Sequence, residues 1–346
     1  MKVQLHSAGD ASPLTALLLP QSIPDILGRR ALSSGRLAAL GATPDFHQGL
    51  LESGDGRHSL RNAAVGRGSR APLVADAGAR VLAGGTDLLV QFRAGVRQPS
   101  AFVDVKRIPE LMSITIDDQG LRLGAAAPAA VISEHAELRR LWPGLAESVR
   151  LIGSTQIQGR GSVGGNLCNG SPAADTTCAL IVNRAQCVIA GPNGERTVPV
   201  DAFSVAPGRT VLQHGELLVA VRVPRPAART GDAYLRLIPR TEMDIAVAGA
   251  GVSVTLDAAG VCTAARVAIG AVAPTALRVP DAERALVGSK LDEASLRDAA
   301  GAAGAAARPI DDKRGTAAYR RTVAGVLTRR AAALAAQRAR QGNDRG

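Results

Sequence analysis

Aromatic residues are scarce in this 346-residue chain, which has one Trp, two Tyr and four Phe. Proteins that bind single-stranded nucleic acid stack bases on aromatic side chains. The scarcity therefore argues against that class, although the net charge is +11. Residues 308–346 hold ten Lys or Arg and three Asp or Glu, a net +7. We interpret this end as a solvated basic helix or a contact with an acidic partner subunit, and we expect no nucleic-acid partner.

Cysteines are few, and long apolar runs are missing. Cys168, Cys178, Cys187 and Cys262 form no C-x-x-C pair, which argues against a zinc or iron–sulfur site in this chain. Their sparseness is typical of reduced thiols in a cytoplasmic protein. No apolar run reaches the ~18 residues that a membrane span needs, and no secretory signal is recognised. We expect a cytoplasmic protein without a membrane span.

Composition divides the chain into four parts. Residues 1–72 are rich in Ser, Gly, Arg and His, so we expect an atypical, poorly ordered N-terminal region. Residues 73–228 alternate strand and helix patterns. Residues 229–338 predict a strand, turn and strand followed by two helices, at about 292–306 and 316–338, and residues 339–346 form a tail. This pattern predicts an α+β (α/β) fold. On the last helix, one apolar face is predicted to hold Tyr319, Val323, Val326, Leu327 and Leu334.

Two glycine pairs carry the strongest chemical signal. Gly84-Gly85 follows a predicted strand and precedes Thr86. Glycine lets backbone N–H groups approach an anion, so this loop suits a pyrophosphate, although a structural turn would explain it equally well. The second pair lies in Ser162-Val-Gly-Gly-Asn166, which we predict to be a loop. Asp175 follows near the start of a predicted helix, where it would also favour the helix dipole.

One further pattern matches a dinucleotide-binding motif but lacks the structural context of that motif. Gly159-Arg-Gly-Ser-Val-Gly164 matches G-x-G-x-x-G, but a dinucleotide fingerprint needs a preceding strand, a following helix and an acid ~20 positions later. Here a helix is predicted before the motif and a loop after it, so we reject a nicotinamide site. The five His are scattered, and no nucleophile elbow is present. We therefore predict no catalytic side chain and no metal site, and expect a cofactor to do the chemistry.

Four segments together resemble one family. Leu82-Ala-Gly-Gly-Thr-Asp-Leu-Leu89 resembles the first FAD loop of the flavin subunits of the xanthine dehydrogenase and carbon monoxide dehydrogenase family (molybdenum hydroxylases), and the segment 156–175 resembles the second. The segments 240–246 and 311–320 are similar to motifs of that family's C-terminal domain. The resemblance spans about 73–335. It implies a PCMH-type FAD-binding domain of two subdomains, followed by a smaller C-terminal domain with an antiparallel sheet and helices.

The resemblance also implies a set of FAD contacts. Asp175 is expected to bond the ribityl or adenosine end, and Ile152 and Leu218 to pack near the flavin. Arg236 stands where the family often has Lys, and a cation there could stabilise negative charge on reduced flavin. The pyrophosphate and flavin should be lined by Leu82, Ala83, Gly84, Gly85, Thr86, Asp87, Leu88, Ser162, Val163, Gly164, Gly165 and Asn166.

The implied assembly is an oxidoreductase with a large molybdopterin-binding subunit and a small [2Fe–2S] subunit, as a dimer of heterotrimers. Electrons would pass from a cluster to the flavin and on to an external acceptor. The family opens with a strand, a Pro-x-Ser/Thr turn and a helix; we recognise no counterpart in residues 1–72 and expect a shifted reading frame or a natural extension there. Two alternatives stay open: a stand-alone oxidase with FAD tethered through Cys168, and a flavin-free scaffold subunit.

Overall fold

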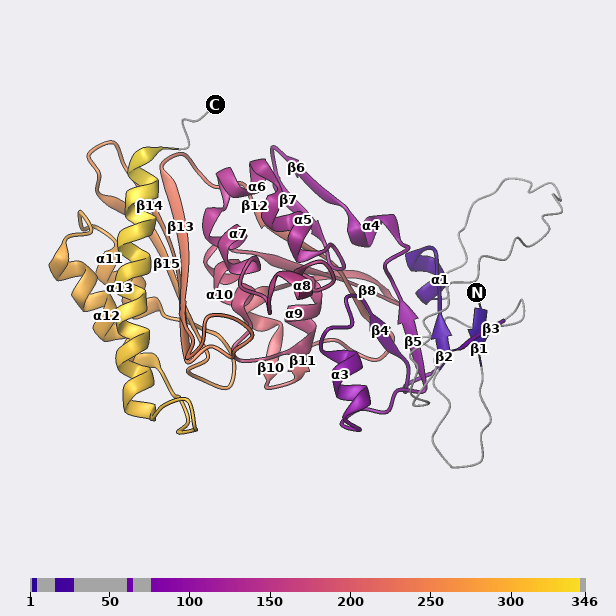
Figure 1. Ribbon diagram of the computed structural model, residues 1–346. Coiled ribbons are helices and arrows are strands. Elements are labelled where there is room, and N and C mark those ends of the chain that lie inside the picture. The colour runs from indigo at the N-terminus through magenta and orange to yellow at the C-terminus, as the bar shows by residue number, and fades with distance from the viewer. Residues whose placement is uncertain (1, 5–15, 28–60, 65–75, 343–346) are drawn as a thin grey trace.

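Three main sheets organise the chain in a computed structural model that describes residues 2–4, 16–27, 61–64 and 76–342. A small parallel sheet lies at one end, a five-stranded sheet in the middle and a four-stranded sheet at the other end (Figure 1). Two-stranded pairs are formed by β1 (Lys2–Gln4) with β3 (Arg61–Ala64) and by β10 (Ser204–Ala206) with β11 (Arg209–Thr210). The predicted mixture of helices and sheets is confirmed.

The parallel sheet has the strand order β2 (Ala16–Leu18), β5 (Ala101–Asp104), β4 (Arg80–Leu82). Helix α1 (Ile23–Leu27) follows β2, and Ile26 is fully buried beside Val103. Residues 16–27 thus form a strand and a short helix within the region where we recognised no counterpart of the family's opening elements. The segment Pro20-Gln-Ser22 between them has the Pro-x-Ser pattern that we did not recognise there. For residues 1, 5–15, 28–60 and 65–72, the expectation lies outside the described residues.

The five-stranded sheet is antiparallel, with the order β6 (Ile114–Asp117), β7 (Gly120–Gly124), β12 (Leu217–Pro224), β8 (Gln186–Gly191), β9 (Gly194–Pro199). Its two hairpins turn at Asp117-Asp-Gln-Gly120 and at Gly191-Pro-Asn-Gly194. One face packs against the fully buried Trp142 and Leu145, and the other against the parallel sheet. The helices of this part are α3 (Leu88–Arg93), α4 (Pro109–Met112), α5 (Ala129–Glu134), α6 (Ala136–Leu141), α7 (Pro143–Val149), α8 (Thr155–Gln158), α9 (Val163–Asn169) and α10 (Asp175–Val182), with a 3₁₀ turn at Val200–Ala202.

The C-terminal sheet is a meander of β13 (Thr230–Leu237), β14 (Ala248–Leu256), β15 (Cys262–Gly270) and β16 (Leu277–Arg278). Helices α11 (Pro280–Leu286), α12 (Glu293–Ala306) and α13 (Ala317–Gln341) follow it. The strand–turn–strand unit and the last two helices agree with the sequence pattern. Strand β13 and helix α11 do not follow from the pattern, because their short, interrupted apolar runs carry no clear period.

The buried face of α13 matches the predicted one only in part: Leu327 is buried, and Val323 and Leu334 pack against the core. Tyr319 is 49% exposed and Val326 is 36% exposed, whereas the buried positions are mostly alanine. The reason is close packing: a Cβ on Gly231 of β13 would lie 2.3 Å from the carbonyl oxygen of Ala335. Only small side chains permit such a close approach of helix and strand. Hydrophobic periodicity weighted by side-chain size therefore misses the alanine positions of the buried face.

Polar contacts join the C-terminal sheet and its last helix to helix α7. Asp232 on β13 accepts hydrogen bonds from the N–H groups of Gly144 and Leu145, at 3.0 and 3.2 Å. These groups belong to the first turn of α7, where backbone donors lack intrahelical partners. Arg338 on α13 pairs with Glu147 of α7 and also donates to the Asp232 carbonyl oxygen. Through Arg338, helix α13 therefore contacts both α7 and β13.

Candidate cofactor-binding site

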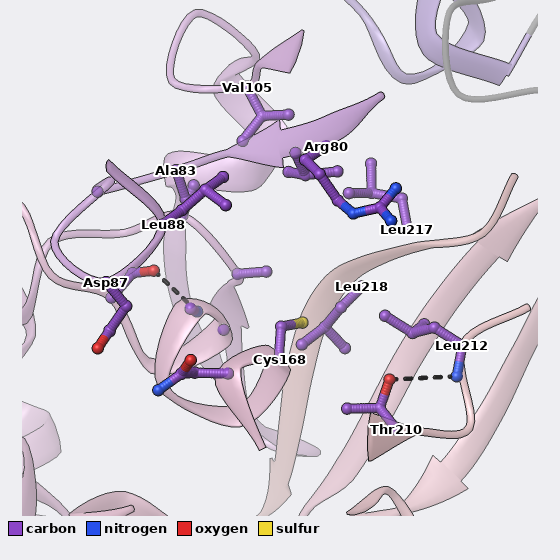
Figure 2. Close-up of a pocket in the computed structure, with 18 of the residues that line it drawn as sticks. Arg80, Ala83, Asp87, Leu88, Val105, Cys168, Thr210, Leu212, Leu217 and Leu218 are labelled. Carbon is purple, nitrogen blue, oxygen red and sulfur yellow. Dashed lines mark hydrogen bonds between the residues drawn. The ribbon is translucent and has the colours of Figure 1, made fainter. Parts of the chain in front are cut away.

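A cavity of about 800 Å³ lies between the parallel sheet, helix α9 and the chain that leads into β12. Figure 2 shows side chains from these separate segments facing one another, with Arg80 and Leu88 opposite Leu212 and Leu218. Cofactor pockets measure roughly 300–1,000 Å³, so the cavity is large enough for a cofactor. Its lining mixes backbone of two glycine loops with apolar and charged side chains.

The first glycine pair lies where β4 ends and α3 begins. Gly85 has a φ of 76°, a left-handed conformation that favours glycine. Among the described residues, no acceptor pairs with the N–H groups of Gly84, Gly85 or Thr86. Lys106 holds the loop from behind, because its Nζ donates to the Ala83 carbonyl oxygen at 3.0 Å and forms an ion pair with Asp104. The loop therefore presents free backbone donors in a fixed conformation.

The second glycine pair lies in the first turn of helix α9, not in a loop as predicted. Ser162 caps the helix, and its Oγ accepts the N–H of Gly165 at 3.0 Å. Gly164 donates to the Ala125 carbonyl oxygen, and a Cβ on Gly164 would lie 2.3 Å from that oxygen. The rejection of the dinucleotide fingerprint still stands: helix α8 precedes the motif where a strand is needed, although a helix does follow.

The two glycine segments touch each other. A Cβ on Gly84 would lie 2.0 Å from the carbonyl oxygen of Arg160, which leads into α9. Gln91 on α3 donates to the Asn169 side chain on α9 at 3.2 Å. The first and second loops therefore form one wall of the cavity, although about 80 residues separate them in sequence.

Twelve of the sixteen predicted contact residues line the cavity. They are Ala83, Gly84, Gly85, Thr86, Asp87, Leu88, Ile152, Ser162, Gly164, Gly165, Asn166 and Leu218. Leu82 and Val163 are buried in the core behind it, 6% and 1% exposed. Asp175 and Arg236 lie outside the lining and form a buried ion pair at 2.8 Å. The cofactor contacts expected of Asp175 and Arg236 stay predictions.

Burial dominates the chemistry of that ion pair. It raises the pKa of the Asp175 carboxyl to about 6, although the guanidinium of Arg236 and the hydroxyl of Tyr234 act in the opposite direction. The Tyr234 hydroxyl lies 3.4 Å from Asp175, in the same buried interface between α10 and β13. The carboxylate thus has its polar partners inside the protein.

Sequence reasoning missed most of one wall. Residues 208–217 line the cavity opposite the first loop, with Arg209 and His214 among them. The pair Arg196–Glu216 fixes this segment through two contacts of 2.7 Å, and it holds the pKa of Glu216 below its usual range. No motif marks the segment, because its contribution depends on how β12 places it against α9.

Among the described residues of the lining, burial raises the pKa of two groups. Burial raises the pKa of the Asp87 carboxyl, which accepts no hydrogen bond from the described residues. Cys168 has surface open to the cavity, yet the protein atoms around its thiol raise the pKa to about 12. Since the thiolate is the nucleophilic form, Cys168 is a poor nucleophile at neutral pH.

The described residues hold no group of three His, Cys, Asp or Glu side chains that could ligate a metal, and no helix among them has the length and hydropathy of a membrane span.

FAD suits the donor set that is present. Free N–H groups at Gly84 and Gly85 suit a pyrophosphate, and the apolar side chains of Ile152 and Leu218 suit a flavin ring. Fold and cavity together define a protein that binds a large, phosphate-containing redox cofactor.

Comparison with known proteins gives the family. Residues 70–226 match the FAD binding domain in molybdopterin dehydrogenase, and residues 233–335 match the CO dehydrogenase flavoprotein C-terminal domain. The carbon monoxide dehydrogenase medium chain of Hydrogenophaga pseudoflava is 36% identical over 253 residues, covering 73% of this chain and 88% of the relative. The xanthine dehydrogenase FAD-binding subunit of Escherichia coli O157:H7 is 34% identical over 220 residues, covering 63% and 75%.

Solved structures agree. A chain in the crystal structure of the cyanide-inactivated Cu,Mo-CO dehydrogenase matches with a TM-score of 0.78 at 29% identity, covering 93% of this chain and 97% of that chain. The protein therefore belongs to the family of FAD-binding medium subunits of the molybdenum hydroxylases. It is an oxidoreductase component with FAD as its cofactor, as the resemblance implied.

Proposed function

We propose that this chain is the electron-transfer subunit of a molybdenum hydroxylase, placed between the [2Fe–2S] clusters of a small partner subunit and an external acceptor. When bound, FAD supplies the ability to exchange electrons singly with a cluster and in pairs with an acceptor. The observation that carries the proposal is the cradle at Gly84 and Gly85, whose free N–H groups face a cavity of cofactor size. The protein's own part is to bind and orient the cofactor.

Several finer points belong to the same proposal. The cofactor contacts are the cavity-lining residues of the two glycine loops together with Ile152 and Leu218, and the FAD-binding and C-terminal domains meet near residue 229. The partners are a large molybdopterin-binding subunit and a small [2Fe–2S] subunit, assembled as a dimer of heterotrimers in the cytoplasm. The relatives named as chains of carbon monoxide and xanthine dehydrogenases support these partners.

Co-expression with the partner subunits tests the proposal. The purified complex should contain one FAD per copy of this chain, and substrate reduction of the complex should bleach the flavin absorption. A complex that assembles and turns over without FAD would refute the proposal and support the flavin-free scaffold instead. Acid precipitation tests the other alternative, a stand-alone oxidase in which FAD is covalently attached to the protein. The raised pKa of Cys168 disfavours a thiolate tether, so we expect the yellow colour to leave with the supernatant.

A further inference from the structure

Thr176 is a fully buried residue in the first turn of α10, and it lies outside the cavity lining. Its hydroxyl donates to Oδ1 of Asn166 at 2.7 Å, and its backbone N–H reaches the same oxygen at 3.4 Å. Asn166 does line the cavity. Thr176, which does not line the cavity, thus holds the side chain of Asn166, which does.

The two contacts determine which way the Asn166 carboxamide faces. A backbone N–H can only donate, so the atom of Asn166 that faces Thr176 must be the oxygen. The NH₂ group then occupies the other corner of the planar carboxamide and finds no acceptor among the described residues. It therefore offers hydrogen-bond donors to the cavity, which suits a carbonyl or phosphate oxygen of a ligand.

The start of α10 is itself held by the C-terminal sheet. Asp175, the residue before Thr176, forms its ion pair with Arg236 and lies 3.4 Å from the Tyr234 hydroxyl, both on β13. Gly249 on β14 leaves room for the tyrosine, since a Cβ there would lie 2.7 Å from that hydroxyl. The pair of Asp175 and Arg236 therefore anchors the start of α10, from which Thr176 reaches Asn166.

We propose that Thr176 is a positioning residue that turns the NH₂ group of Asn166 toward bound FAD, with the Asp175–Arg236 pair holding the start of α10 in place. This inference rests on FAD binding in the cavity. It assigns a role to Thr176, which lies outside the cavity lining.

The test is FAD titration of the full-length apoprotein, with thermal stability measured in parallel. Thr176→Val keeps the side-chain shape and removes the hydroxyl, so the carboxamide loses its main anchor. We expect FAD to bind about tenfold more weakly, the effect of roughly one hydrogen bond, and Thr176→Ser to restore the affinity. Thr177→Val is the matched control, because Thr177 is the next buried residue of α10 and makes no contact with Asn166.

Asn166→Asp provides a second, independent variant. It keeps an oxygen for Thr176 to bond and replaces the NH₂ donor with an acceptor, so FAD affinity should fall even if Thr176→Val does not fold. Wild-type affinity in a folded Thr176→Val protein or in Asn166→Asp would overturn the inference, as would an equal loss in Thr177→Val. A wild-type chain that binds no FAD would overturn the proposed function as well, which distinguishes the two failures.

Discussion

Gly84 is the position at which the structure makes its sharpest prediction. A Cβ at residue 84 would lie 2.0 Å from the Arg160 carbonyl oxygen and 2.6 Å from its carbonyl carbon, whereas real Cβ contacts stay beyond 3.0 Å. Gly84→Ala therefore forces the two backbones apart by about 1 Å, and overpacking of this kind costs about 1–3 kcal/mol. Because this contact joins both glycine loops, we expect FAD affinity to fall at least tenfold, equal to about 1.4 kcal/mol.

The assay is quenching of flavin fluorescence on titration of FAD with apoprotein, together with thermal denaturation. Gly159→Ala is the control, since Gly159 lies in the same segment as Arg160 but its Cβ would meet nothing within 4 Å. That variant should bind FAD as the wild type does. If Gly84→Ala bound FAD with wild-type affinity, close contact between the loops would not shape the site and the reasoning would be refuted.

Three further predictions concern groups around the cavity. Lys106→Met should weaken FAD binding about tenfold in the same titration, because the first loop loses its charged anchor. Asp232→Ala leaves two buried N–H groups of α7 without an acceptor, so chemical denaturation should show a loss of about 3 kcal/mol. Arg236→Met should raise the pKa of Asp175 above its value of about 6. A raised pKa means that the folded state holds the proton more tightly than the unfolded chain, so stability falls as the pH rises from about 4 through the folded pKa. Thermal denaturation should therefore show a larger cost of Arg236→Met at about pH 8 than at about pH 5; an equal cost at both would refute the assignment.

Local patterns predicted the elements that carry a strong period or a turn. The strand, turn and strand of the C-terminal part and its last two helices follow from alternation and spacing, and the structure has them. Helix α9 was predicted as a loop because its two glycines have poor helix propensity. Tertiary contacts explain the difference: Gly164 packs against Ala125 at a distance that no Cβ permits, and Ser162 caps the helix.

The glycine pairs also show why a motif predicts a site better than it predicts each residue's role. From the sequence, the first glycine pair was equally consistent with an anion cradle or a structural turn. In the structure both permit close backbone contact, with Arg160 and with Ala125, while Gly85 takes the left-handed conformation. Those contacts bring distant loops together and leave the N–H groups of the first loop unpaired at the cavity. The packing role and the binding role are therefore one requirement, since the donors face the cofactor only where the two backbones meet.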